Sequence, residues 1–365
     1  MARQEPRPLR RGWTTGACAA AAARAAYQAL LTGEFPDPVT IRLPRGHKPS
    51  FPLALAEMTG GGARAGIVKD AGDDPDVTHG ATIVAEVAWA DTGSGIGFAA
   101  GEGVGTVTRP GLQLAVGEPA INPAPRAMIR EALVELAEAN GAPLPDVTVT
   151  IAVPGGARLA EKTMNARLGV VGGLSILGTT GIVVPYSCAS WVHSIHRGID
   201  VARAAGLDHI AAATGSTSER AVQRLYGLPD HALIDMGDFV GGTLKYLRSH
   251  PVPLLTLAGG FAKLAKFAGG HLDLHSSKSA VDLAMLLQML AAAGADEPTQ
   301  AAAKGCDSAG AVLEAAGQWA TALADGVARR AREAALATLS GATAVEVAIV
   351  DRGGEFLARV GAEAK

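Results

Sequence analysis

The chain has 365 residues, of which 48% are hydrophobic and 18% are charged, and its formal net charge is −3. This length and composition predict a folded protein with room for about two domains. Basic residues do not outnumber acidic ones, which disfavours general nucleic-acid binding. The three cysteines, Cys18, Cys188 and Cys306, have neither the even count of a disulfide framework nor the CxxC spacing of a zinc site. We therefore expect a cytoplasmic protein.

The N-terminal segment predicts a capped helix and no export signal. Arg10, Arg11 and Trp13 stand where an export signal would carry its apolar stretch, and the alanine run comes only after Cys18. No run approaches the roughly 20 apolar residues of a membrane-spanning helix, so we expect no membrane partner. The spacing predicts a helix over 19–31, with Thr14 or Thr15 accepting from its free N–H groups, and such a start attracts anions.

Residues 39–153 are predicted to form strands and a helix without regular alternation. Alternating apolar residues predict strands over 39–43, 81–89 and 147–153, and a helix follows Pro123 and Pro125 and ends at Asn140. The glycine-rich loop 91–97 imitates a cofactor loop, but the glycines and the proline that follow it predict a strand or hairpin where that motif needs a helix. Residues 1–188 therefore predict an α+β domain.

A cluster of acidic residues lies in the segment 69–79, which reads KDAGDDPDVTH. Paired carboxylates in a partly buried cleft can supply an acid and a base, so Asp70 and Asp73 are candidate catalytic residues together with His79. A site for a hard cation and a solvated turn are the two other interpretations of the same residues.

The second half of the chain shows a regular alternation of predicted strands and helices. A helix over 191–205 is followed by three repeats of strand, short loop and helix, which is typical of a parallel sheet with crossover helices. Two long alanine-rich helices and a strand pair around Arg352 follow, and we expect the pair to close an edge of the sheet. Residues 189–365 thus predict an α/β domain that is Rossmann-like and three-layered, with extra helices and a terminal strand pair.

Ligands of such sheets bind outside the carboxyl ends of the strands. Three loops are expected to meet there, and their candidate cofactor-binding residues are Thr214, Gly215, Ser216, Asp238, Gly259 and Gly260. Asp238 follows the second strand, where a ribose is commonly held. The residues alone predict a nucleoside-sized site.

Several sequence words in fixed order resemble the CbiD family. They are RGWTTGACAAAAARAA, VKDAGDDPDVTHG, GEGVGTVTRPGL, GEPAINPAPRAMI, TMNARLGVVGGLSILGTTGIVVPYS, ATGSTSERA, MGDFVGGTL and KLAKFAGGHLDLHS, which span Arg11 to about Ser276. The resemblance implies an S-adenosylmethionine-dependent enzyme of anaerobic cobalamin synthesis. Such an enzyme methylates carbon 1 of cobalt-precorrin-5B to give cobalt-precorrin-6A.

The resemblance also implies a tetrapyrrole substrate with several carboxylate arms and its own cobalt, so the protein needs no metal site of its own. Scattered basic groups and hydroxyls suit such arms. The candidate substrate-binding residues of the first domain are Thr14, Thr15, Arg126, Lys162, Arg167, Thr179 and Thr180. A nicotinamide-dependent tetrapyrrole reductase and a corrinoid carrier without catalysis remain alternatives, and the oligomeric state stays open, a homo-oligomer included.

Overall fold

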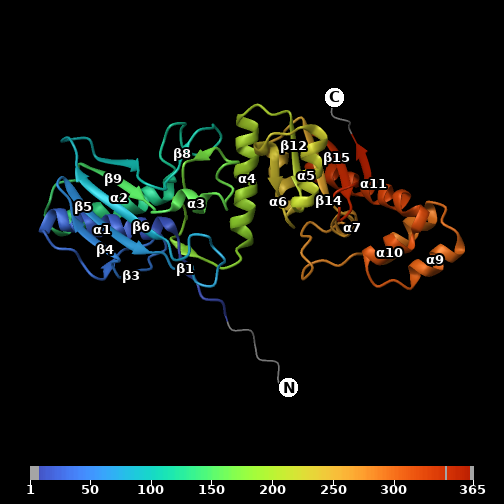
Figure 1. Ribbon diagram of the computed structural model, residues 1–365, viewed down its shortest axis with the longest axis horizontal. Coiled ribbons are helices and arrows are strands. Elements are labelled where there is room, and N and C mark those ends of the chain that lie inside the picture. The colour runs from blue at the N-terminus through green and yellow to red at the C-terminus, as the bar shows by residue number, and fades with distance from the viewer. Residues whose placement is uncertain (1–7, 342, 362–365) are drawn as a thin grey trace, which may run out of the picture. The chain divides into compact units, whose positions relative to one another are not determined.

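The computed structural model describes residues 8–341 and 343–361, and the chain divides into two compact units, Met1–Ser187 and Cys188–Lys365 (Figure 1). Each unit combines helices and strands around its own hydrophobic core, with both parallel and antiparallel strand pairs. The prediction of a mixed α and β protein is confirmed at this level.

The first unit is built on a five-stranded sheet with the order β4-β5-β6-β9-β7. Neighbouring strands are antiparallel except β7 and β9, which run parallel. The strands are β4 (Leu55–Met58), β5 (Gly62–Val68), β6 (Thr82–Trp89), β9 (Val147–Ala152) and β7 (Ile96–Ala100). The glycine loop before β7 opens into this strand and not into a helix, as predicted.

Helix α1 (Thr15–Thr32) packs against β5, β6 and α2 (Pro123–Ala139). Its alanines from Ala19 to Ala26 are fully buried, because small side chains let the helix backbone approach the sheet and α2 closely. The helix begins four residues before the predicted start, where the Thr14 Oγ1 atom accepts from the N–H of Ala17 at 3.1 Å. It ends at Gly33, whose φ of 80° suits glycine.

Short ladders organise the rest of the first unit. They join β1 (Gly12–Trp13) to β11 (Ile182–Val183), β8 (Thr106–Val107) to β10 (Val170–Val171), and β2 (Val39–Thr40) to β3 (Ser50–Phe51). The short helix α3 (Gly156–Ala160) packs against the core of the unit through Leu159 and Ala160. The strand expected over 39–43 is thus shorter than predicted. The glycine-rich segment 163–187 contains β10 and β11, so it provides one strand to each of two two-stranded sheets.

The second unit contains a five-stranded sheet with the order β13-β12-β14-β15-β16, parallel except for the antiparallel edge strand β16. The strands are β12 (His209–Ala213), β13 (Leu233–Asp235), β14 (Leu254–Gly260), β15 (Ala344–Val350) and β16 (Phe356–Gly361). The terminal strand pair closes one edge of the sheet, as predicted.

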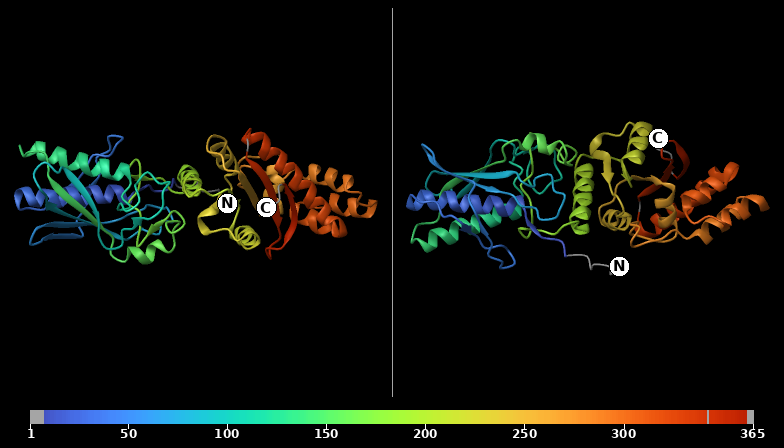
Figure 2. Two further views of the ribbon diagram at one scale, coloured as in Figure 1. Left: turned by 90° about the horizontal axis from the view of Figure 1, so that it is seen from above. Right: turned by 60° about the horizontal axis from the view of Figure 1, so that its bottom comes forward.

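Alternate residues of these strands face different helices. Ala211 and Ala213 pack with α5 (Ser216–Tyr226), whereas Ile210 and Ala212 belong to the larger core on the other face. The helices of that face include α4 (Cys188–Ala204), α6 (Val240–Ser249), α7 (Phe261–Ala268) and α11 (Ala320–Leu339). Figure 2 shows the red helix α11 beside the sheet.

The alanine-rich tail differs from the prediction of two long helices. It forms four: α8 (Leu283–Ala292), α9 (Glu297–Lys304), α10 (Ala309–Ala315) and the long α11. The breaks have a local cause, because Asp282, Asp296 and Ser308 each cap a new helix with a side-chain oxygen. In the described part of the chain, no helix is long and apolar enough to cross a membrane. The cytoplasmic location stays a prediction.

A close backbone approach in the first unit gives a stability test. A Cβ atom placed on Gly12 would lie 2.1 Å from the carbonyl carbon of Ala71, whereas one on Gly60 would meet nothing within 4 Å. We expect Gly12→Ala to lower the free energy of unfolding by about 1–3 kcal/mol, because the backbone must shift. Urea unfolding compares it with Gly60→Ala, and equal midpoints for the two variants would contradict this packing.

Candidate functional site

A pocket of about 830 Å³ opens in the second unit at the carboxyl edge of the parallel strands. Its wall combines the loop and helix start after β12, the start of α7 after β14, the turn after β15, and part of α10. The lining residues are Thr214, Gly215, Ser216, Thr217, Ser218, Gly260, Phe261, Ala262, Lys263, Ser308, Gly310, Ala311, Leu313, Glu314, Val350, Asp351, Arg352 and Leu357.

The strand order explains why the pocket lies there. From β12 the chain crosses through α5 to β13 on one side, and it then passes β12 to reach β14 on the other side. The loops after β12 and β14 therefore lead to helices on opposite faces of the sheet and leave a crevice between them. Such reversals of strand order are where open α/β sheets bind ligands.

The structure brings four of the six predicted cofactor-binding residues to this pocket: Thr214, Gly215, Ser216 and Gly260. Gly259 is not in the lining, and it has a packing reason instead, since a Cβ atom there would lie 2.8 Å from the Thr214 Oγ1 atom. Asp238 is also absent from the lining. Its carboxylate forms an ion pair with Lys263, which does line the pocket.

Two of the lining glycines leave room for a ligand. Gly215 and Gly260 precede α5 and α7, and a Cβ atom on either would meet no atom within 4 Å. Neither helix start has a side-chain cap, so N–H groups of both first turns have no side-chain acceptor at the cap position. A ligand can thus approach two helix starts closely.

Three charged residues of the pocket were not predicted from the sequence: Glu314, Asp351 and Arg352. Glu314 stands in a tail whose helices were not resolved individually from the sequence, and Asp351 and Arg352 belong to the turn of the terminal strand pair. Asp351 and Arg352 reach the pocket because β15 pairs in parallel with β14, so that both strands end at the carboxyl edge of the sheet. The sequence did not reveal this pairing.

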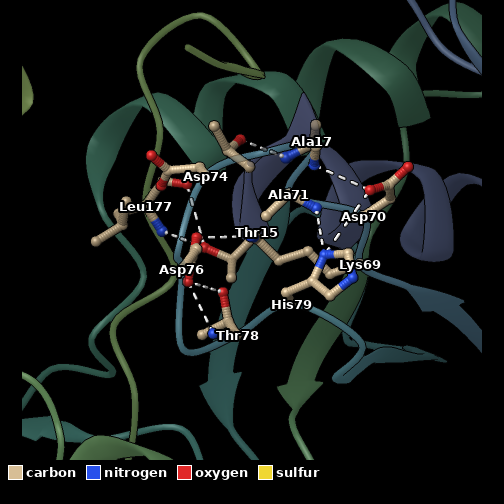
Figure 3. A network of polar contacts seen from close by, with 12 residues as sticks. Thr15, Ala17, Lys69, Asp70, Ala71, Asp74, Asp76, Thr78, His79 and Leu177 are labelled. Atoms are coloured by element: carbon tan, nitrogen blue, oxygen red, sulfur yellow. Dashed lines mark hydrogen bonds and ion pairs between the residues drawn. The ribbon is translucent and has the colours of Figure 1, made fainter. Parts of the chain in front are cut away.

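The first unit brings another group of predicted residues together around the start of α1. We call this group the α1 corner; it consists of residues 10–16, 69–80 and 177–186. Thr14 N–H donates to the carbonyl of Gly181 at 3.0 Å, Gly16 N–H to that of Leu177 at 3.0 Å, and Trp13 N–H to that of Asp70 at 2.7 Å. Figure 3 shows Thr15, Leu177 and the loop from Lys69 to His79 side by side.

Asp70 and Asp73 are both held by Arg10. The Arg10 guanidinium binds the Asp70 carboxylate, and the backbone N–H of Arg10 donates to Asp73 Oδ2 at 2.6 Å. The hydrogen bond from Arg10, followed by that from the N–H of Gly72, lowers the pKa of Asp70 to about 2. At neutral pH Asp70 is therefore an ionised, weak base.

His79 makes a different contact. Its Nδ1 atom accepts from the N–H of Ala71 at 3.0 Å, so the ring hydrogen of the neutral form lies on Nε2. The imidazole is 53% exposed. This hydrogen bond fixes the imidazole against the loop.

The one buried ion pair of the α1 corner joins Lys69 and Asp76. Lys69 is 1% exposed, and its Nζ atom donates to Asp76 Oδ2 at 2.7 Å, while Thr78 donates twice to Oδ1. Burial raises the pKa of Asp76, but the hydrogen bond and charge of Lys69 and the bonds from Thr78 outweigh it, and the net pKa is lowered. The sequence interpretation grouped these residues without assigning the pair.

The predicted hydroxyls of this corner are largely used within the protein. Thr14 caps α1, and Thr15 Oγ1 accepts from the N–H of Leu177 at 2.9 Å and donates to its carbonyl at 3.2 Å. Thr180 Oγ1 contacts the backbone of Ile182 at 3.3 Å. Thr179 is exposed. The same segment exposes apolar side chains, with Leu177 50% and Tyr186 67% accessible.

The three predicted basic residues lie outside the α1 corner. Arg126 is committed within the unit: its guanidinium donates to the carbonyl of Ile121 at 2.7 Å, pairs with Glu118 at 2.6 Å and lies over the Phe98 ring. Lys162 is exposed after α3, and Arg167 is half-buried. Among the described residues, no group of three or more His, Cys, Asp or Glu side chains is placed to hold a metal ion.

The depressed pKa of Asp70 predicts a pH effect. The pKa of Asp70 is about 2 in the folded protein and 3.8 ordinarily. The ionised carboxylate therefore contributes its full stabilisation above about pH 4, and this contribution is lost as the pH falls toward 2. We expect Asp70→Asn to unfold at a lower temperature than the parent at pH 6, with the difference shrinking below about pH 4. Thermal unfolding against pH measures this, with Asp91→Asn as the exposed-turn control. A pH-independent difference would count against the Arg10–Asp70 contact.

Breaking the Lys69–Asp76 ion pair is expected to lower the free energy of unfolding more than breaking an exposed pair. Lys69→Met leaves the Asp76 carboxylate without its cation, and we expect a loss of about 2–4 kcal/mol in the free energy of unfolding, somewhat discounted because Asp76 is partly exposed. Arg10→Met breaks an exposed pair and serves as the control, with a much smaller change. Urea unfolding that ranks the two variants the other way would refute the assignment.

Comparisons with known proteins give the family. The model described as CbiD matches residues 2–185, and that of the CbiD C-terminal domain matches residues 273–361. A relative from Brucella anthropi is 59% identical over 98% of this chain and 97% of its own length. Another from Bradyrhizobium sp. is 61% identical over 97% of this chain and 94% of its own. Both are named cobalt-precorrin-5B C(1)-methyltransferase.

Among solved structures, the cobalamin biosynthesis protein (cbiD) from Archaeoglobus fulgidus is similar with a TM-score of 0.40 and 29% identity, over 72% of this chain and 80% of that one. The family models and the nearly full-length relatives confirm the resemblance seen in the sequence words. The chain belongs to the CbiD family.

Proposed function

We propose that this protein transfers a methyl group from S-adenosylmethionine to carbon 1 of cobalt-precorrin-5B, giving cobalt-precorrin-6A in anaerobic-type cobalamin synthesis. The observation that carries the proposal is the identity of about 60% with methyltransferases of that name over nearly the whole chain. Cobalt arrives as part of the tetrapyrrole substrate.

The second unit is proposed as a Rossmann-like, three-layer domain that holds the methyl donor. The fit rests on the open space at Gly215 and Gly260, because a nucleoside needs a close approach to backbone at the strand ends. Thr214 and Ser216 supply hydroxyls beside these glycines. When bound, S-adenosylmethionine supplies an electrophilic methyl group on a positively charged sulfur.

Asp238 and Gly259 act indirectly in this proposal. Asp238 holds Lys263 at the pocket wall, and Gly259 lets β14 approach Thr214. Both residues thus position groups that line the pocket. Alignment of the two reactants then removes much of the barrier to methyl transfer.

The first unit, which corresponds to the domain expected over residues 1–188, is proposed to bind the tetrapyrrole at the α1 corner. Leu177 and Tyr186 offer exposed apolar surface to the macrocycle, and Tyr186 is held with a φ of 54° by a hydrogen bond to Asp74 of 2.9 Å. Such a conformation is unusual for a bulky residue. Arg11 is an exposed residue of the same corner and is proposed to bind a carboxylate arm.

The remaining predicted residues take different parts in the proposal. Thr14, Thr15 and Thr180 shape the corner, Thr179 presents a free surface hydroxyl, and Lys162 and Arg167 hold carboxylate arms farther out. Arg126 fixes the entry to α2. His79 is the proposed group for proton transfer at Nε2, with Asp70 and Asp73 orienting the loop through Arg10.

The alternative activities make different binding predictions. A nicotinamide-dependent reductase should bind NADPH in the pocket, whereas a methyltransferase should bind S-adenosylhomocysteine there. A corrinoid carrier should bind the tetrapyrrole and neither cofactor. Titration calorimetry of the parent protein with the two cofactors separates the three.

A bulky side chain in the pocket tests the donor site. We expect Gly260→Val to weaken S-adenosylhomocysteine binding at least about tenfold, because the side chain enters the space where the ligand must approach the backbone. Gly60→Val places the same side chain in open space of the first unit and should leave affinity unchanged. Undiminished binding by Gly260→Val in calorimetry would move the donor site elsewhere.

A further inference from the structure

Two charged side chains of the pocket have no partner in the described part of the chain. Among the charged groups of the lining, Lys263 is paired with Asp238, and Asp351 Oδ1 accepts from the N–H of Glu355 at 2.9 Å within its turn. Glu314 and Arg352 form no hydrogen bond or ion pair through their side chains with any residue that the structure describes. Both side chains are exposed, so the pocket presents one solvated carboxylate and one solvated guanidinium to a ligand.

Their positions come from two separate elements. Glu314 lies on α10, and Arg352 lies in the turn from β15 to β16. The glycines that leave space for a nucleoside, Gly215 and Gly260, lie at the starts of α5 and α7 instead. The two unpaired charges thus lie on α10 and the β15–β16 turn, whereas the open backbone lies at the starts of α5 and α7.

A ligand that satisfies both charges must itself carry both signs. A free α-amino-acid group does so at neutral pH, with an ionised carboxylate and a protonated amine. Arg352 suits the carboxylate because a guanidinium can donate two parallel hydrogen bonds to it, and Glu314 suits the ammonium.

We propose that Glu314 and Arg352 bind the amino-acid head of the methyl donor and make the pocket specific for it. This inference rests on the proposed function and deepens it, since it assigns the two ends of the donor to two parts of one pocket. The carboxylate of the head binds Arg352 and its ammonium binds Glu314. The nucleoside lies toward Gly215 and Gly260.

The test compares two ligands that differ in this head. S-adenosylhomocysteine carries it, whereas 5′-methylthioadenosine has the same nucleoside and sulfur without it. Calorimetry is run on the parent, on Glu314→Gln and on Arg352→Gln. We expect each variant to bind S-adenosylhomocysteine about tenfold more weakly and 5′-methylthioadenosine within about twofold of the parent.

Controls and contrary outcomes separate the two levels of the proposal. Glu333→Gln and Arg248→Gln remove exposed charges outside the pocket lining and should change neither affinity. Unchanged binding of S-adenosylhomocysteine by the pocket variants, or equal losses for both ligands, would overturn the head assignment alone. A parent that binds neither ligand would overturn the donor site and this inference together.

Discussion

The parallel pairing of β12 with β14 is the constraint on which the candidate donor site depends. Both strands end at the same edge, and the pairing continues past β12, where Thr214 N–H donates to the carbonyl of Ala258 at 2.9 Å. This contact places the start of α5 beside that of α7. The absence of a side chain at Gly259 permits the approach, since a Cβ atom there would collide with Thr214. A pocket with two helix starts follows from the strand order.

The first unit uses a related device at the α1 corner. The start of α1 is enclosed by chain segments far apart in sequence, and glycines stand where their backbones nearly touch. A Cβ atom on Gly178 would lie 2.3 Å from that of Thr14, and Gly12 meets Ala71 in the same way. The buried Lys69–Asp76 pair then fixes the acidic loop from within. The glycine-rich sequence is thus required by packing as well as by any ligand.

Much of the second unit could be predicted because its signals are local. Apolar strands, capped helix starts and short loops repeat along the chain, and the loops after β12 and β14 were expected at the ligand edge. The four helices of the tail were merged into two, since alanine-rich sequence hides short breaks until caps such as Asp296 are seen to act. The boundary was expected at 188, and the compact units divide after Ser187.

The site was harder to predict, because its chemistry depends on partners that periodicity does not reveal. The acidic segment 69–79 was singled out from the sequence, but its carboxylates are divided between Arg10, Lys69 and backbone N–H groups. Asp238 was placed at the correct strand end, and only the ion pair shows that it faces Lys263. Glu314 and Arg352 gave no local signal, since the tail brings them to the pocket only after β15 joins the sheet.

The proposed function depends on methyl-donor binding at the carboxyl edge of the sheet in the second unit. A crystal structure of the protein with S-adenosylhomocysteine is the decisive experiment. We expect ligand density in the pocket lined by Gly215 and Gly260. Well-defined density within the first unit, with that pocket empty, would contradict it.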